Sequence, residues 1–320
     1  MWKTILKRFL VMIPQLFLLS VIVFTLAKFM PGDPFTGLIK PDTDPAAIER
    51  LREEAGLNDP IHIQYINWVK NAIQGDLGKS YTQNLPVTRV IGERVGNTFY
   101  LSLLTVVIMY AIAIPLGIIA GKRQGSLADK AITTYNFIAL AIPGFVFYLI
   151  ILLIFGYRLG WFPTGGSVST GTDPGTIAYF FDKLYHMILP ALATAVLSTI
   201  STIQYLRSGI IDAKNQDYVR TAISKGVPMK KVYSKHILRN SILPIAAFFG
   251  FQITGLLGGN IMVESVFAYP GMGQLFMNSV TSRDYAVLTS LILLYGLLSL
   301  IGSLLSDIIL SIVDPRIRIE

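Results

Sequence analysis

The amino-acid sequence predicts an all-α protein that crosses a membrane six times and keeps both termini in the cytoplasm. Three observations predict this class. Only 14% of the 320 residues are charged and the mean hydropathy is +0.57, whereas a soluble domain has about 25% charged residues. Six apolar runs contain no Asp, Glu, Lys, Arg or His. The Lys and Arg residues are concentrated in alternate connections between these runs.

We interpret each run as a helix across the bilayer, because crossing the hydrocarbon core takes about 20 mostly apolar residues. The first run follows Lys3, Lys7 and Arg8, as the apolar part of a secretory signal would. It is longer than such a signal and no cleavage pattern follows it, so we expect it to remain as the first span. The six predicted spans are Phe9–Ala27, Thr98–Ala120, Ile132–Tyr157, Met187–Leu206, Ser241–Val263 and Tyr285–Ser306.

The orientation follows from the distribution of cations. Sixteen of the 27 Lys and Arg residues lie before the first span, in the second–third and fourth–fifth connections, and in the C-terminal tail. An excess of Lys and Arg marks the cytoplasmic side of a membrane protein. The net charge of +8 is therefore a topology signal, and nucleic acid is not expected among the partners.

These spans divide the chain into three parts. Residues 1–30 hold the cytoplasmic N-terminus and the first span. Residues 31–97 form a long external loop region with short helices. Residues 98–320 form the membrane domain, which includes a cytoplasmic loop at 207–240.

Two short helices are predicted in the external region. Asp44-Pro45 and Asp59-Pro60 are start signals, and Gly56 and Gly75 are stop signals. The second helix carries an apolar stripe, which we expect to pack on the membrane domain rather than to bind a ligand. The stripe consists of Tyr65, Ile66, Val69, Ala72 and Ile73.

The segment from Gly75 to Ser80 resembles the end of a phosphate-binding loop. Ile73 stands where that loop requires a glycine, and the segment is predicted to lie outside the cytoplasm. We therefore expect no nucleotide site there.

Residues suited to bond chemistry are sparse. The chain has no cysteine, and His62, His186 and His236 lie too far apart for metal-ligand spacing. The carboxylates of the external region fit helix caps and solvated faces better than the active site of a membrane-anchored enzyme. No catalytic and no metal site is predicted.

The predicted spans carry neutral polar side chains but no ionisable ones. A transporter driven by an ion gradient usually holds an ionisable group in the membrane, so this composition favours a path for a polar solute. Hydrogen bonding between helices is the alternative for each single residue. The candidate path residues are Thr194, Ser198 and Thr202 in the fourth span and Gln252 and Asn260 in the fifth.

Small residues predict close helix contacts. Gly117 and Gly121 are spaced four apart, as are Gly255 and Gly259, so each pair leaves a flat helix face for a neighbour in this chain or in a second membrane subunit. Pro143-Gly144 interrupts backbone hydrogen bonding within the third span and permits a kink.

The cytoplasmic loop at 207–240 contains a predicted short helix from Asp217 to the terminating Gly226, followed by a cationic helical stretch. The small residues Thr221, Ala222 and Gly226 give this helix a shallow surface that could enter a groove on another protein. A basic amphipathic segment lying on anionic lipid is an equal alternative.

Arg220-Thr-Ala222-Ile-Ser-Lys-Gly226, followed by Ile242-Leu-Pro244, resembles the EAA loop of membrane subunits of bacterial ABC importers. Arg220-Thr221 in place of Glu-Ala, and the long distance to the proline, are similar to the oligopeptide/dipeptide permease branch. The long loop after the first span resembles its B-type permease. Other matching fragments are Pro31-Gly-Asp-Pro34, Asn97-Thr98, Val263-Glu-Ser-Val-Phe267, Pro270-Gly-Met-Gly273 and Asp314-Pro-Arg-Ile-Arg318.

This resemblance implies a permease subunit of a heteromeric importer in the bacterial inner membrane, with oligopeptides or dipeptides as cargo. Its partners would be a second, C-type permease, two cytoplasmic ATPases and an external peptide-binding protein, which the loop at 31–97 would meet. ATP-Mg would bind to the ATPases, and this chain would bind no cofactor. The loop residues implied to contact an ATPase are Arg220, Thr221, Ala222, Lys225 and Gly226.

Two alternatives remain at this point. Within the same family, nickel or another small solute could be the cargo. From a different class, the chain could be an ATP-independent secondary transporter.

Overall fold

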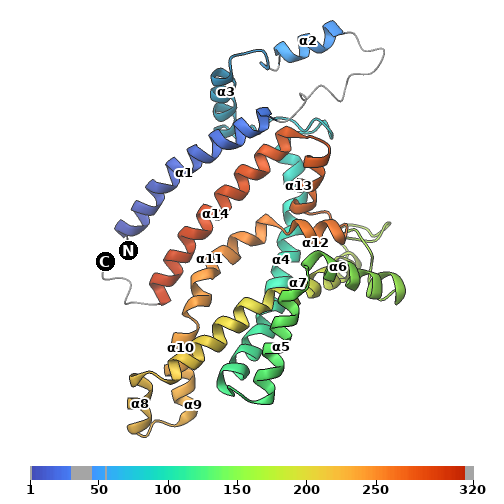
Figure 1. Ribbon diagram of the computed structural model, residues 1–320. Helices are drawn as coiled ribbons and strands as arrows, with labels where there is room; N and C mark the ends of the chain where they lie inside the picture. Colours follow the sequence, from blue (N-terminus) through green and yellow to red (C-terminus); the bar gives the residue numbers. More distant parts are fainter. Residues whose placement is uncertain (1, 30–44, 55, 314–320) are drawn as a thin grey trace.

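The computed structural model describes residues 2–29, 45–54 and 56–313, which form helices joined by turns without a β-strand (Figure 1). Five helical segments are long and apolar enough to cross a membrane, or six when one sharply bent pair is counted as a span. The expected all-α membrane fold is thus confirmed. The segments are α1 (Trp2–Phe29), α4 (Val87–Lys122), α7 (Ile177–Lys214), α11 (Leu243–Gly258) continued by α12 (Ile261–Val266), α14 (Tyr285–Val313), and the bent pair of α5 (Leu127–Ala141) with α6 (Gly144–Ile151).

The predicted third span, Ile132–Tyr157, is not one straight helix. The chain bends by 99° between α5 and the stretch formed by α6 and the π-helical turn η2 (Leu152–Arg158). Ile142 adopts an extended conformation with φ −83° and ψ 123°, as expected for the residue before a proline. Pro143 also lacks the N–H that would continue the helix. The interruption at this position was predicted, but its size was not.

Helices α4 and α7 form the centre of the fold. In the most apolar 18-residue window of α7, 61% is buried inside the protein, whereas in the corresponding window of α1 only 11% is buried. The predicted contact face of Gly117 and Gly121 is confirmed, and its neighbour is α7 of the same chain. A Cβ atom on these glycines would lie 2.7 and 2.8 Å from the Cβ atoms of Leu206 and Ile210. Only glycine permits this approach of the two helices.

The second glycine pair behaves differently from the prediction. A Cβ atom added to Gly255 would meet no described atom of another element within 4 Å, and Gly259 has φ +74° and ends α11. The two residues therefore do not form one flat contact face. The close contact of α11 is made by Gly250 instead, which packs against the backbone of α14 at Gly302 and Ser306.

Helix α1 packs along α14 (Figure 1). Leu19 lies directly over Gly296, and Arg8 Nε lies 3.1 Å from Asp307 Oδ2. The other neighbour of α1 is α3 (Ile61–Ile73), whose Tyr65 hydroxyl lies 2.7 Å from Ser20 Oγ.

The predicted helices of the external region are present. Helix α2 (Pro45–Glu54) begins at the expected proline, whereas α3 begins at Ile61 with Pro60, not Asp59, as its N-cap residue. The apolar stripe of α3 is confirmed only in part. Tyr65 stacks edge-on against Phe24 of α1, but Ile66 and Ile73 are exposed.

Several short helices lie at the two ends of the bundle (Figure 1). One end holds α2, α3 and α13 (Met272–Thr281). The other end holds the α4–α5 connection and the segments α8 (Asp217–Ser224), α9 (Met229–Lys231), η3 (Val232–Ile237) and α10 (Leu238–Ser241). Helix α4 is continuous across residue 97, and α7 continues into the loop predicted at 207–240.

Replacing Gly250 by alanine is expected to destabilise the fold by about 3 kcal/mol, because its methyl group would lie 2.2 Å from Ser306 N and 2.6 Å from Gly302 O. Gly255→Ala, on the same helix but without such a contact, should be neutral or slightly stabilising. The midpoint of thermal unfolding in detergent measures both. Equal midpoints for the two variants would contradict the packing described for α11 and α14.

Candidate functional site

Helix α8 is held at one end of the bundle by the C-terminus of α7. After Lys214 the backbone turns within two residues, and Asn215 N–H and Gln216 N–H donate to the carbonyls of Asp212 and Ala213 at 3.2 Å. Helix α8 then starts at Asp217, an acidic residue suited to a helix N-terminus. The turn is therefore short and leaves α8 close to the end of α7.

The inner face of α8 is part of a small apolar core. Val219 and Ala222 are buried against Ile210 of α7 and against Val232 and Ile237 of η3. The small side chain of Ala222 is thus explained by packing within this chain. Its side chain faces inward, and the contact of this position with an ATPase stays a prediction.

The other four predicted coupling residues share the exposed side of α8 and its C-terminus. Arg220 forms a solvated 3.8 Å ion pair with Asp217, which leaves its guanidinium accessible. Thr221 Oγ1 donates to the carbonyl of Asp217. Lys225 ends the helix, and Gly226 follows with φ +72°. Glycine is favoured at 226 because residues with a Cβ atom rarely adopt this left-handed conformation.

The surface around α8 combines apolar and cationic groups. Tyr218, Ile223 and Met229 are exposed, and exposed lysines follow in α9 and η3 at Lys230, Lys231 and Lys235. Exposed apolar groups bordered by charges are typical of a protein interface. An amphipathic helix on lipid would direct its apolar face outward, whereas the apolar face of α8 is buried in its own core. The arrangement favours a protein partner over a lipid surface.

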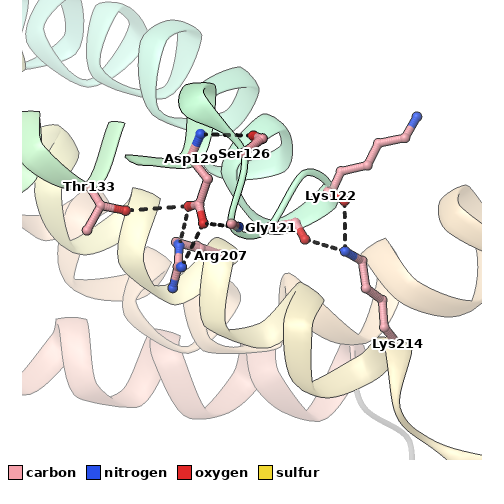
Figure 2. Close-up of polar contacts among 8 residues, drawn as sticks. Gly121, Lys122, Ser126, Asp129, Thr133, Arg207 and Lys214 are labelled. Carbon is pink, nitrogen blue, oxygen red and sulfur yellow. Dashed lines mark hydrogen bonds and ion pairs between the residues drawn. The ribbon is translucent and has the colours of Figure 1, made fainter. Parts of the chain in front are cut away.

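An ion pair fixes the α4–α5 connection to α7 beside this surface (Figure 2). Arg207 donates from Nε and Nη2 to the two carboxylate oxygens of Asp129 at 2.6 and 2.9 Å, and the Asp129 side chain is only 4% exposed. Gly125 N–H donates to Asp129 Oδ2 at 2.9 Å, and Ser126 Oγ accepts from Asp129 N–H. Asp129 therefore joins the start of α5 to α7.

Lys214 forms a second connection between the same elements (Figure 2). Its Nζ donates to the carbonyls of Gly121 and Lys122 at 2.5 and 2.9 Å, at the C-terminus of α4 where helix carbonyls lack partners. Lys122 and Lys214 also lie over the ring of Tyr233 in η3, at 5.2 and 5.9 Å from its centroid. Burial raises the pKa of Tyr233 above its usual value.

Three of the predicted path residues meet at one pocket of about 150 Å³. Thr194 of α7 and Gln252 of α11 line it with Asn260, which follows the end of α11. The Asn260 side chain has a structural task as well, because its Oδ1 accepts from the N–H groups of Met262 and Val263 and so caps α12.

Ser198 and Thr202 do not reach this pocket. Ser198 is exposed elsewhere on α7, and Thr202 is buried between α7 and α4 with its hydroxyl 3.7 Å from the sulfur of Met109. The prediction missed Ser102 and Thr105 of α4, which line the pocket. Their spacing from Thr98, at four and seven residues, was a helical signal that could have found them.

The segment that resembles a phosphate-binding loop has another role. Ser80 is buried, and its Oγ donates to Asp284 Oδ2 at 2.5 Å. Thr82 Oγ1 donates to the same oxygen at 2.8 Å. The serine thus holds this segment to the start of α14 and is not available to a phosphate group.

Residues 113–319 match a family described as the inner membrane component of binding-protein-dependent transport systems, and residues 1–103 match its N-terminal region. Three curated relatives cover nearly the full chain. The oligopeptide transport system permease protein AppB of Bacillus subtilis is 40% identical over 98% of both chains. A putative peptide permease protein of Brucella ovis is 36% identical over 100% of both. The glutathione transport system permease protein GsiC of Escherichia coli K12 is 34% identical over 99% of both.

Asp129→Ala is expected to destabilise the protein by about 2 kcal/mol, because it leaves the partly buried Arg207 guanidinium without its carboxylate. The matched control is Arg89→Ala, since Arg89 and Glu93 form an exposed pair at 3.1 Å, and it should cost less than about 0.5 kcal/mol. Thermal unfolding of the full chain in detergent compares the two. A similar loss of stability in both variants would show that the Asp129–Arg207 pair contributes no more than an exposed ion pair.

Proposed function

The chain belongs to the family of binding-protein-dependent transport system inner membrane components, the permease subunits of ABC importers, and from this premise we propose that it translocates short peptides. As a member of this family with several apolar spans, it is a multi-pass protein of the bacterial inner membrane. Membership also favours ATP-driven import over an ATP-independent secondary transporter.

The peptide cargo is supported by the relatives and by the pocket. Two of the relatives are named for peptides and one for glutathione, which is itself a tripeptide. The pocket presents amides from Gln252 and Asn260 and hydroxyls from α4 and α7. Such groups match the N–H and C=O groups of a peptide backbone better than the requirements of a nickel ion, for which nitrogen ligands of histidine or carboxylates are preferred.

The observation that carries the coupling role is the two-sided packing of α8. Its inner side is fixed to α7 and η3, while its outer side presents Arg220, Thr221 and Lys225 to a partner. A helix held in this way transmits a push to α7 instead of yielding by itself. In the proposed mechanism an ATPase carrying ATP-Mg seats α8 in a groove at the cytoplasmic face, and its closure moves α7 and changes access to the pocket. Ala222 then serves as the internal anchor of α8.

We also propose contact surfaces for the remaining partners. The exposed aromatic residues Phe248, Phe249 and Phe251 of α11 suit contact with a second, C-type permease subunit, because only 11% of the apolar window of this segment is buried. The end of the bundle with α2 and α3 is the proposed contact of the external binding protein. Part of the expected contact region, 30–44 and 55, lies outside the described residues.

The cargo is tested with the purified chain, its second permease, both ATPases and the binding protein in liposomes. We expect ATP-dependent uptake of labelled dipeptides or oligopeptides, competition by unlabelled peptide, and no uptake of nickel. Omitting the ATPases is the control and should abolish uptake. Nickel uptake that peptide does not inhibit would assign the other cargo, and uptake without the ATPases would exclude the proposed function.

The coupling role is tested by two neighbouring substitutions. Thr221→Trp enlarges the outer face of α8 and should reduce peptide uptake at least 10-fold without changing thermal stability. Ala222→Trp enlarges the buried face and should cost about 2 kcal/mol of stability. Normal uptake by Thr221→Trp in the assembled transporter would contradict the contact of α8 with an ATPase.

A further inference from the structure

Glu264 is a buried carboxylate for which the proposed function has no role. It lies in α12, which contacts α13, and is only 1% exposed. It belongs to the fragment Val263-Glu-Ser-Val-Phe267, for which the sequence predicts no task. Burying a carboxylate is costly unless hydrogen bonds compensate, so its partners should explain its presence.

The Glu264 carboxylate joins three elements. Thr98 Oγ1 of α4 donates to Oε1 at 2.9 Å, and the N–H groups of Gly273 and Gln274 at the start of α13 donate to Oε2 at 2.6 and 3.1 Å. Thr98 Oγ1 also accepts from Met272 N–H at 2.8 Å, which directs its own hydrogen toward Glu264. All of these partners donate, and the described residues include no salt-bridge partner for Glu264. The N-terminus of α13 thus takes the place of a cation.

Glycines make the space for this carboxylate. A Cβ atom on Gly259 would lie 2.6 Å from Glu264 Oε1, and one on Gly271 would lie 2.4 Å from Oε2. On Gly273 it would lie 2.7 Å from the backbone of Ile261. Gly271 has φ −114°, so only the lack of space, not an unusual backbone conformation, requires glycine there. The surrounding chain leaves room for the carboxyl group of Glu264 by having glycine at these three positions.

The same carboxylate borders the pocket of the proposed path. Glu264, Gly259 and Asn260 line the pocket together with Gln252 and Gly255 of α11. Glu264 therefore connects the pocket wall formed by α12 to both α4 and α13. A rearrangement that opens the pocket between α12 and α4 must break the bond between Glu264 and Thr98.

We propose that Glu264 is a positioning residue for transport, which holds α12 and α13 against α4 at the wall of the pocket until the helices move. The assignment of the pocket to the path rests on the proposed function, whereas the contact of the three helices does not. Loss of the carboxylate should loosen this contact in the resting protein and expose side chains that are buried at the pocket wall.

Asp284 offers a comparison for this proposal. It is equally buried, and it accepts from Ser80, Thr82 and, at 3.4 Å, from Val287 N–H at the start of α14. Unlike Glu264, it does not line the pocket. A general effect of removing a buried carboxylate would appear at both positions, whereas the contact of α12 with α4 at the pocket wall depends on Glu264 alone.

Because the chain contains no cysteine, one introduced thiol can report how accessible the pocket wall is to a labelling reagent. Val263→Cys places one thiol in α12 at the pocket wall, at a position that is only 1% exposed in the structure. The reporter is labelled with a polar maleimide in the assembled transporter in nanodiscs, without nucleotide or cargo. We expect Glu264→Ala to raise the labelling rate at least 5-fold. Glu264→Gln, which can still accept from Gly273 and Gln274, and Asp284→Asn should change it less than 2-fold.

Thr98→Val provides a second variant if Glu264→Ala does not assemble. It removes the bond from the α4 side at nearly constant volume, and it should also raise the labelling rate. The maximal rate of peptide uptake should fall in Glu264→Ala and in Thr98→Val. Glu264→Gln should retain most of the parent rate. Labelling at the parent rate in the variant that assembles, or an equal increase in Asp284→Asn, would overturn the proposal. Because labelling needs neither ATP nor peptide, it remains decisive even if the parent fails to import peptide.

Discussion

The close approach of α4 and α7 at Gly117 and Gly121 is the contact on which the rest of the structure depends. Without side chains at these two positions, Leu206 and Ile210 of α7 reach the backbone of α4. This alignment brings the end of α4 within reach of Lys214 and the start of α5 within reach of Arg207. The inner face of α8 then finds its apolar neighbours at the end of α7. Helix contact in a membrane relies on packing more than on the hydrophobic effect, so the missing side chains matter more here than they would in water.

Helix ends are the second constraint, because an unpaired backbone group is costly where water is scarce. In this structure, carboxylates and a lysine side chain form hydrogen bonds with unpaired backbone groups at helix ends. Glu264 and Asp284 accept N–H groups at the starts of α13 and α14, and Lys214 donates to carbonyls at the end of α4. Each of these side chains also contacts a distant segment of the chain. The same groups that complete a helix end therefore fix how the helices are arranged, which links the local chemistry of the termini to the tertiary structure.

The sequence was sufficient for features with a local cause. Charge-free runs marked the spans, proline and glycine marked the starts and stops of α2 and α3, and Pro143 marked the interruption of the third span. Features that join distant residues escaped prediction. Thr98 and Glu264 are separated by 166 residues, and no periodicity relates them. The inward direction of Ala222 depends on η3, and the exposure of Ile66 and Ile73 depends on the angle of α3 against α1. Similarly, Thr194, Gln252 and Asn260 were selected by polarity, but only packing shows that they share a pocket while Ser198 does not.

The pairing of α1 with α14 has a consequence for biogenesis. The ribosome produces α1 before α14, so Leu19 can pack over Gly296 and Arg8 can pair with Asp307 only once α14 is present. During synthesis α1 must therefore reside in the lipid with most of its surface uncovered, apart from its contact with α3. Helix α1 is thus made long before the helix that it packs along, and its packing is completed only after α14 has been inserted.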